Sequence, residues 1–126
     1  MTSPTSPPPP RYFWEDFPVG QVREFGSYRV TREAVLAFAR EFDPQPFHLD
    51  DAAAEASLFG RLAASGWHTC AMAMRMMCDA YLLESRPTAR RPDVGILRSR
   101  WEVMNQDDET VLTMEGYGMF RRREAA

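Results

Sequence analysis

One nearly uninterrupted apolar segment, Trp67–Glu84, constrains the fold of this chain more than any other feature. Its interior ionisable residues, His68, Arg75 and Asp79, are spaced seven and four residues apart, so they share one narrow stripe of a helix. Apart from Thr69 and the final glutamate, the other positions are Ala, Met, Leu, Cys, Tyr or Trp. A helix that is apolar around most of its circumference is normally buried. At about 1.5 Å per residue it would be roughly 27 Å long, and it needs a cover.

A hairpin downstream of this helix is the predicted cover. From Leu97 to Val103, apolar or small residues alternate with charged ones, which is typical of a half-buried strand. The polar stretch Asn105–Asp108 predicts a turn, and Thr110–Phe120 alternates again. A long buried helix beside an antiparallel sheet predicts an α+β fold.

Two further elements are expected before the apolar segment. An aromatic cluster within residues 12–17 is closed by a Pro18–Gly20 turn, and a strand is predicted at about Gln21–Val30. Its apolar residues are partly out of phase, and Gly26 is read as a bulge, so the register stays open. Thr31 is a good N-cap for the next element.

An amphipathic helix is predicted after Thr31. Its apolar side chains recur at i, i+3, i+4 and i+7, and they are Val35, Phe38, Ala39 and Phe42. This helix should stop at Asp43, because Pro44 disfavours helical angles in the residue before it. A short helix is expected at Asp51–Ser57.

Composition limits the kind of protein. With 126 residues, the sequence predicts one domain at 12–126 after a disordered Pro-rich tail at 1–11. A net charge of -3 argues against a nucleic-acid partner. The N-terminus shows no secretory signal and no stretch suits a membrane span, so a cytoplasmic protein is expected. Cys70 and Cys78 form no CxxC pair and are interpreted as reduced core residues.

The loop Asp43-Pro-Gln-Pro-Phe-His48 is the strongest candidate for chemistry. It puts a carboxylate and an imidazole five residues apart on a segment stiffened by two prolines. The carboxylate can accept a proton and the imidazole titrates near neutrality, so together they can hold and activate a water. The alternative is structural, because Asp before Pro often ends a helix and a single loop His is often a packing residue.

Ser65 and Gly66 precede the apolar helix. The first N–H groups of a helix lack internal partners and lie at the positive end of its dipole, so they can bind a carbonyl that gains negative charge. In the alternative, Ser65 only caps the helix, and Gly66 is present only because a residue without a side chain fits there.

The remaining polar and sulfur-containing residues favour structural roles. Four methionines of the helix could line an acyl pocket, but core packing is preferred for Met72, Met74, Met76 and Met77. His68 has no second ligand at a suitable spacing, so no metal site is predicted. Arg75 and Asp79 form an i,i+4 pair that supports the helix. Three arginines could contact the phosphates of a carrier or simply lie in a solvated loop, namely Arg86, Arg90 and Arg91. The run Arg121–Arg123 is interpreted as a solvated chain end.

The ordered run from Phe38 to Asp50, followed by Ala56–Gly60 and Leu62–Trp67, resembles the hydratase motif of the MaoC-like (R)-specific enoyl-CoA hydratases. The resemblance covers roughly residues 15–123. It implies the hotdog fold, an antiparallel sheet wrapped around a long helix. It also implies that Asp43 and His48 hold the water that adds to a trans-2-enoyl thioester, giving the (R)-3-hydroxyacyl product, or that the reverse occurs.

The resemblance also assigns the neighbouring residues and the partners. Gln45 would orient the site, and the Gly66 N–H would polarise the thioester carbonyl with Ser65 as a helper. No metal or redox cofactor is implied, since coenzyme A or an acyl carrier belongs to the substrate. A homodimer or a hotdog heterodimer is expected.

One departure from the family pattern shortens the predicted sheet. About ten residues separate Ser85 from Gly95, where family members usually place two further strands. About three strands are then expected instead of five. This favours, as an alternative to a hydratase, a non-catalytic or half-site hotdog subunit that needs a partner chain. A hotdog thioesterase is a further alternative, which the Asp43/His48 motif argues against.

Overall fold

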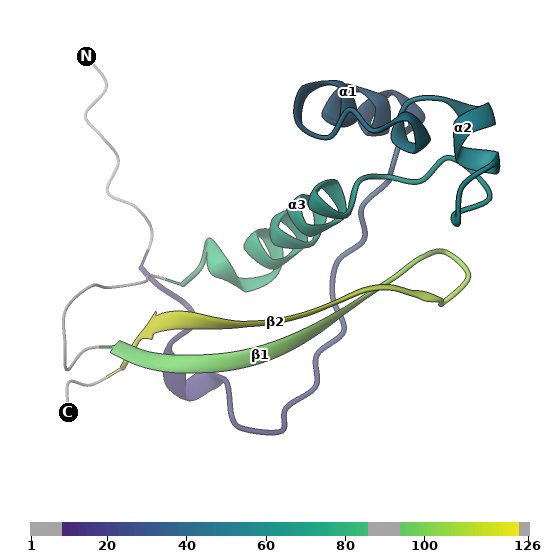
Figure 1. Cartoon of the computed structure of the whole chain (residues 1–126). Helices are drawn as coiled ribbons and strands as arrows, with labels where there is room; N and C mark the ends of the chain where they lie inside the picture. Colours follow the sequence, from purple (N-terminus) through teal and green to yellow (C-terminus); the bar gives the residue numbers. More distant parts are fainter. Residues whose placement is uncertain (1–8, 86–93, 124–126) are drawn as a thin grey trace, which may run out of the picture. The chain divides into compact units, whose positions relative to one another are not determined.

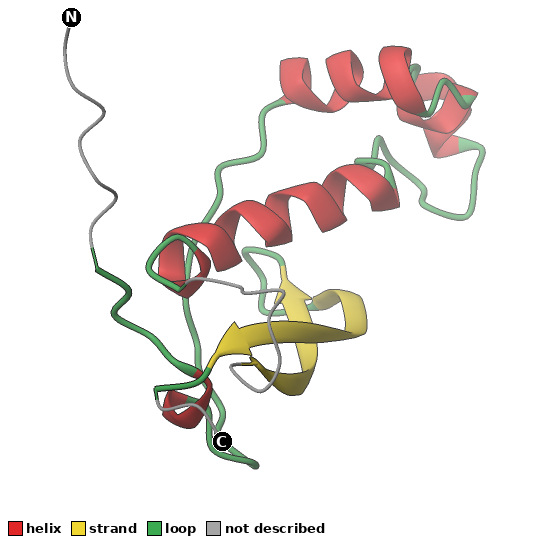
Figure 2. Ribbon diagram, turned by 90° about the vertical axis from the view of Figure 1, so that its left-hand side faces the viewer, coloured by secondary structure: helices red, strands yellow, loops and turns green. Residues whose placement is uncertain are grey.

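The computed structural model describes residues 9–85 and 94–123. The elements follow one another as η1 (Trp14–Asp16), α1 (Arg32–Phe42), η2 (Pro46–His48), α2 (Asp51–Glu55), α3 (Gly66–Met77), η3 (Cys78–Leu82), β1 (Val94–Met104) and β2 (Thr110–Arg121). Figure 1 labels the main helices and strands, and Figure 2 separates them by type. The predicted α+β class is therefore confirmed, with one long helix and a two-stranded antiparallel sheet.

The chain divides into two compact units, Ser27–Met76 and the combination of Met1–Gly26 with Met77–Ala126. The first unit carries α1, η2, α2 and most of α3, and the second carries the hairpin. The expected boundary between a tail at 1–11 and a single domain at 12–126 stays a prediction, because residues 1–8 lie outside the described residues.

Helix α1 forms as its sequence predicts. The Thr31 side chain accepts a hydrogen bond from the Ala34 N–H at 3.2 Å, and Val35 and Ala39 are buried. The helix ends at Phe42 with Asp43 as C-cap, which agrees with the block that Pro44 imposes. The next short helix, α2, starts on Asp50, whose carboxylate caps the Ala53 N–H, but it ends at Glu55 rather than Ser57.

Helix α3 and the turn η3 together cover 66–82, close to the predicted 67–84. The prediction of nearly complete burial is wrong. Met72 and Met77 are buried, whereas Met74 is half-exposed and Trp67 is 74% exposed. Cys70 and Cys78 were expected in the core, but both are only partly buried.

The hairpin β1–β2 is confirmed, with Trp101 facing Met114 in the antiparallel register and an irregularity at Val103/Met104. In the turn, the Asn105 side-chain oxygen accepts from the Asp107 N–H at 2.9 Å and from the Glu109 N–H at 3.0 Å. The inward face of the hairpin packs with the end of the helical segment. This core consists of Met77, Tyr81 and Phe120, with Tyr12, Trp14, Phe17, Ala80, Leu82, Leu97, Trp101 and Met114 around it.

The predicted strand at Gln21–Val30 is wrong. These residues form no regular element, and most of their side chains are exposed. Gly26 has a φ of 75°, a left-handed conformation that interrupts an extended ladder. Val22 is 88% exposed, so the segment lacks a packed face that would fix its register.

The C-terminal arginines are not a free solvated end. Arg123 forms a hydrogen-bonded ion pair with Asp16 at 2.8 Å and its guanidinium lies 5.1 Å from the Phe13 ring centre. Arg122 lies 5.5 Å from the centre of the Trp14 ring. These contacts join the end of β2 to η1, which contributes aromatic side chains to the same core.

We expect Gly95→Ala to destabilise the chain by about 1–3 kcal/mol, the usual cost of overpacking. A Cβ at position 95 would overlap the Trp14 indole, which is held in place because its Nε1–H donates to the Ile96 carbonyl at 3.1 Å. Urea unfolding measures the effect. The exposed Thr113→Ala on β2 is the control and should change stability by less than about 0.5 kcal/mol. Equal midpoints for the two variants would contradict this packing of Trp14.

Candidate active site

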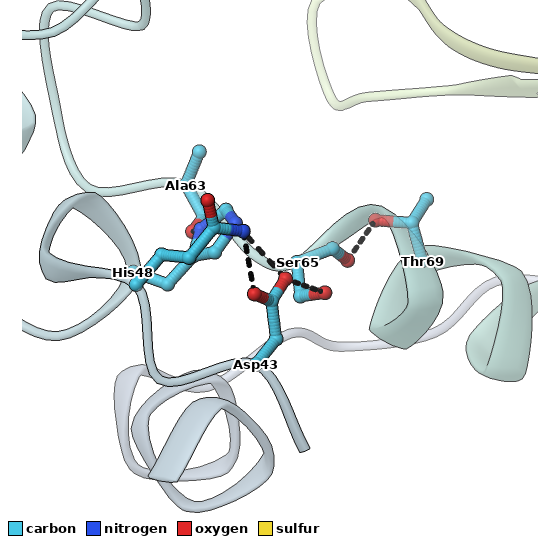
Figure 3. A network of polar contacts seen from close by, with 6 residues as sticks. Asp43, His48, Ala63, Ser65 and Thr69 are labelled. Atoms are coloured by element: carbon cyan, nitrogen blue, oxygen red, sulfur yellow. Dashed lines mark hydrogen bonds and ion pairs between the residues drawn. The ribbon is translucent and has the colours of Figure 1, made fainter.

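Asp43 is the centre of a polar network in the Ser27–Met76 unit, drawn in Figure 3. As the C-cap of α1 it leaves the helix with φ -148° and ψ 66°, and the next residues run as a Pro-stiffened loop. The Ser65 hydroxyl donates to its Oδ2 at 2.6 Å, and the Gln45 Nε2 donates to its Oδ1 at 2.6 Å. Both carboxylate oxygens are therefore held by neutral donors.

His48 ends η2 and is buried, with 5% of its side chain exposed. Its Nδ1 lies 2.7 Å from the Ala63 carbonyl oxygen. A carbonyl oxygen only accepts, so Nδ1 must carry the hydrogen and Nε2 is the atom free to exchange a proton. That Nε2 lies 3.4 Å from Asp43 Oδ2, and a dashed line in Figure 3 marks this contact.

The pairing of Asp43 with His48 has a chemical consequence. In the neutral tautomer both facing atoms, Nε2 and Oδ2, are acceptors. Two states satisfy them: an imidazolium whose Nε2–H points at the carboxylate, or a water that donates to both atoms. The arrangement can thus hold a water or exchange a proton across 3.4 Å.

The electrostatics of Asp43 favour the carboxylate. The pKa of Asp43 lies below its ordinary value, first because the Ser65 hydroxyl donates to it, then because Gln45 does, and also through the charge of His48. Hydrogen bonds to the ionised form favour that form. Asp43 is consequently suited to accept a proton at neutral pH.

We expect Ser65→Ala to raise the pKa of Asp43 toward its ordinary value, because the largest cause of the lowering is removed. The bonds to Asp43 stabilise the fold above the unfolded-state pKa, and this stabilisation is lost as pH falls through the lower folded value. A ¹³C NMR titration of the carboxyl group measures the change. Thr69→Ala is the matched control, because its hydroxyl donates to the Ser65 carbonyl and not to Asp43. Identical Asp43 titrations in Ser65→Ala and the parent would refute the assignment.

Ser65 joins this network to the start of α3. It is fully buried, and its carbonyl oxygen accepts from the Thr69 N–H at 3.0 Å and from the Thr69 hydroxyl at 3.3 Å. Helix α3 begins at Gly66, one residue before the predicted start at Trp67. The N–H groups of this first turn have no partner four residues earlier within the helix. The donors expected at Gly66 therefore follow directly after the residue that holds Asp43.

Two features of the site had no usable signal in the sequence. The Ala63 carbonyl is backbone, which no residue type marks. Phe47 and Phe59 lie beside the His48 ring, with ring centres at 4.6 Å and 6.0 Å, and pack on each other at 5.5 Å. Phe47 belongs to the motif loop, whereas Phe59 comes from the turn before Gly60.

Other candidate residues lie apart from this network or outside the described part. The proposed phosphate contacts Arg86, Arg90 and Arg91 all lie outside the described residues. Among the residues that are described, there is no group of three or more His, Cys, Asp or Glu side chains with the spacing of a metal site. Within the same residues, no helix has both the length and the apolarity needed to cross a bilayer.

Comparison with known proteins decides the family. The model of the MaoC like domain matches residues 16–93, which include the whole Asp43/His48 network. The chain belongs to the MaoC-like family. Protein YdeM of Bacillus subtilis (strain 168), which is uncharacterized, is 36% identical over 65 residues, or 52% of this chain. That match spans 46% of YdeM, so the chain aligns with about half the length of this curated relative.

A solved structure of the same family gives the fold. The crystal structure of the MaoC-like dehydratase from Rhodospirillum rubrum matches with a TM-score of 0.74 and 34% identity, over 91% of this chain and 99% of that one. The predicted shortened hotdog fold is confirmed, with two strands in the described residues instead of the three expected. Membership of the MaoC-like family supports a hydratase or dehydratase role in general terms.

Proposed function

We propose that this MaoC-like chain adds water to a trans-2-enoyl thioester to give an (R)-3-hydroxyacyl thioester, or catalyses the reverse dehydration. The observation that carries the proposal is the pairing of a carboxylate with an imidazole at 3.4 Å, each held by its own fixed partner. Hydration needs one group that accepts a proton from water and one that delivers a proton to carbon.

In the proposed hydration, Asp43 and His48 share the proton transfers. The Asp43 carboxylate takes a proton from the bound water as the water oxygen bonds to C3 of the enoyl group. Protonated His48 gives its Nε2 proton to C2. Asp43 then returns its proton to His48 across their contact, which restores both groups. The lowered pKa of Asp43 keeps its carboxylate ionised at neutral pH, which is the form that the acceptor role requires.

The negative charge that develops on the thioester oxygen needs donors. We assign this to the first N–H groups of α3, beginning with Gly66, because they lie at the positive end of the helix dipole. The Ser65 hydroxyl is already donated to Asp43 at 2.6 Å, so its proposed role is to hold that carboxylate. Gln45 does the same on the other oxygen. No metal or redox cofactor is required, and coenzyme A or an acyl carrier enters with the substrate.

The test is hydration of crotonyl-CoA, followed by the loss of enoyl absorbance and by chiral analysis of the product. The expected result is turnover to the (R)-3-hydroxy product. Longer enoyl-CoA substrates are run in parallel. A folded chain that turns over none of them would refute the proposal, and release of free thiol would instead favour a thioesterase.

The shortened sheet favours a second candidate, a subunit that needs another hotdog chain. In the described residues the sheet has two strands, so each has one edge without a strand partner. Large apolar side chains are also exposed, including Trp67 and Tyr117 at 74% and Phe42 at 66%. Exposed apolar patches often mark interaction sites. A homodimer is the simplest assembly, and a hotdog heterodimer the alternative.

Light scattering during size-exclusion chromatography, run alongside the hydration assay at several protein concentrations, separates the two candidates. A dimeric and active chain supports the self-sufficient hydratase. A monomer without activity that gains it on mixing with a second hotdog chain supports the partner-dependent subunit.

A further inference from the structure

His68, in the first turn of α3, is a polar residue that the proposed chemistry does not use. Its side chain is buried, with 8% of the residue exposed, and it stacks face to face on Phe38 of α1 at 4.8 Å between ring centres and 7° between planes. Its Nδ1 is buried and has no hydrogen-bond partner among the described residues. Burying a polar atom without a partner costs free energy, so the ring occupies this position at some cost in stability.

The stacked pair joins the two helices that carry the site. Phe38 also packs on Phe42, with ring centres 5.1 Å apart, and Phe42 directly precedes Asp43. His68 follows Ser65 by three residues, on the first turn of α3. The Asp43–Ser65 hydrogen bond of 2.6 Å therefore spans the same two elements, the end of α1 and the start of α3.

We propose that His68 is a positioning residue, and that its flat stack on Phe38 sets the α1-to-α3 separation on which the Asp43–Ser65 hydrogen bond depends. The proposal rests on the proposed hydratase function for its kinetic readout. Packing is the contact that the structure gives this ring, and a hydrogen bond tolerates only a few tenths of an ångström of displacement. A planar side chain can lie parallel to Phe38, whereas a branched aliphatic one of similar size cannot.

The charge state of His68 agrees with a packing role. The pKa of His68 lies below its ordinary value because burial disfavours the charged form. No charged group contributes to this shift, and α1 presents the Phe38 ring to it. The imidazole is consequently neutral at neutral pH, as an apolar contact requires.

Two substitutions separate positioning from stability. His68→Leu keeps a similar volume and removes the buried Nδ1, so we expect its thermal midpoint to match or exceed that of the parent. Its kcat for crotonyl-CoA should nevertheless fall by about tenfold or more, since small misplacements in an active site are costly. Its KM should change by less than about threefold. His68→Phe restores a flat ring and should recover most of the kcat.

A double-mutant cycle tests whether His68 acts through the Asp43–Ser65 bond. The double variant should lose less kcat than the product of the fold-losses seen in His68→Leu and Ser65→Ala, because both single substitutions weaken the same hydrogen bond. Met72→Ala, at another buried position of α3, is the control and should combine with Ser65→Ala multiplicatively. The proposal would be overturned if the fold-losses of His68→Leu and Ser65→Ala simply multiplied in the double variant. It would also be overturned if kcat fell only in variants whose thermal midpoint fell.

A readout without turnover keeps this proposal separate from the proposed function. Weakening the hydrogen bond from Ser65 should raise the pKa of Asp43. We therefore expect the pKa of Asp43 measured by ¹³C titration of His68→Leu to shift toward the value measured in Ser65→Ala. If the parent is inert on enoyl thioesters, the hydratase assignment fails while this measurement still applies. An Asp43 titration unchanged in His68→Leu would overturn the positioning role.

Discussion

Replacing Asp43 with asparagine is expected to lower kcat/KM for hydration of crotonyl-CoA by about 10²- to 10⁴-fold, the range typical of general acid–base groups. The amide has nearly the shape of the carboxylate, and its oxygen can still accept from Ser65 or Gln45. It has no negative charge and is a far weaker base. The loss should therefore be in catalysis, with the fold retained by circular dichroism.

Asp51→Asn is the matched control for this experiment. Asp51 also pairs with a cation, accepting two hydrogen bonds from Arg32 at 2.8 and 2.9 Å, but both side chains are more than half exposed. Exposed ion pairs contribute little to stability, so the free energy of unfolding should hardly change and activity should stay within about twofold of the parent. Comparable losses for the two asparagine variants would show that Asp43 has no special role.

The second large effect is expected for His48→Asn. The asparagine Nδ2 can occupy a position like that of the histidine Nδ1 and still donate to the Ala63 carbonyl, which the histidine contacts at 2.7 Å. No atom of asparagine replaces Nε2, the atom that lies 3.4 Å from Asp43. We expect kcat/KM to fall by about 10²-fold or more while the loop stays folded.

His48→Ala provides the comparison for His48→Asn. It removes the same Nε2 but also leaves the Ala63 carbonyl without its histidine donor. The two variants should lose similar catalytic activity, whereas His48→Ala alone should be less stable, by about 1 kcal/mol for the hydrogen bond lost at a partly buried carbonyl. Urea unfolding and steady-state kinetics on the same samples separate the two effects. Substantial turnover by His48→Asn would rule out Nε2 as a proton donor.

Local signals predicted α1 and the hairpin well. The first turn of α1 is capped by Thr31 and its end is imposed by Pro44, so residues next to the helix determine both boundaries. The hairpin follows from strict alternation along 97–103 and from a polar turn. In both cases the repeat of apolar residues is long enough to distinguish the 3.6-residue period of a helix from the two-residue period of a strand.

The predicted strand at Gln21–Val30 failed for a physical reason. A strand is stabilised by its neighbours, and nothing within those residues determines whether a partner strand exists. Val22 and Phe25 were already out of phase with a single buried face. Burial of α3 was overestimated because the residues of a helix alone do not reveal which other elements pack against it.

The sequence identified the residues of the candidate site but not the contacts between them. Asp43 and His48 came from a loop motif, Ser65 and Gly66 from their place before the apolar helix, and Gln45 from the resemblance to the MaoC-like family. That Ser65 and Gln45 both donate to Asp43 depends on the fold bringing residue 65 next to residue 43. The backbone acceptor at Ala63 and the stacking partner of His68 depend on tertiary geometry in the same way.

The π-helical turn η3 at Cys78–Leu82 follows directly on α3, which ends at Met77. A π turn accommodates one more residue than an α turn, so side chains after it are rotated relative to those before it. Gly66 and His68 lie before this change, and the buried Tyr81 lies within it. A chain with one residue fewer here could continue as an ordinary α-helix without disturbing the first turn. A change in the length of this segment is therefore expected to leave the residues around Asp43 in place.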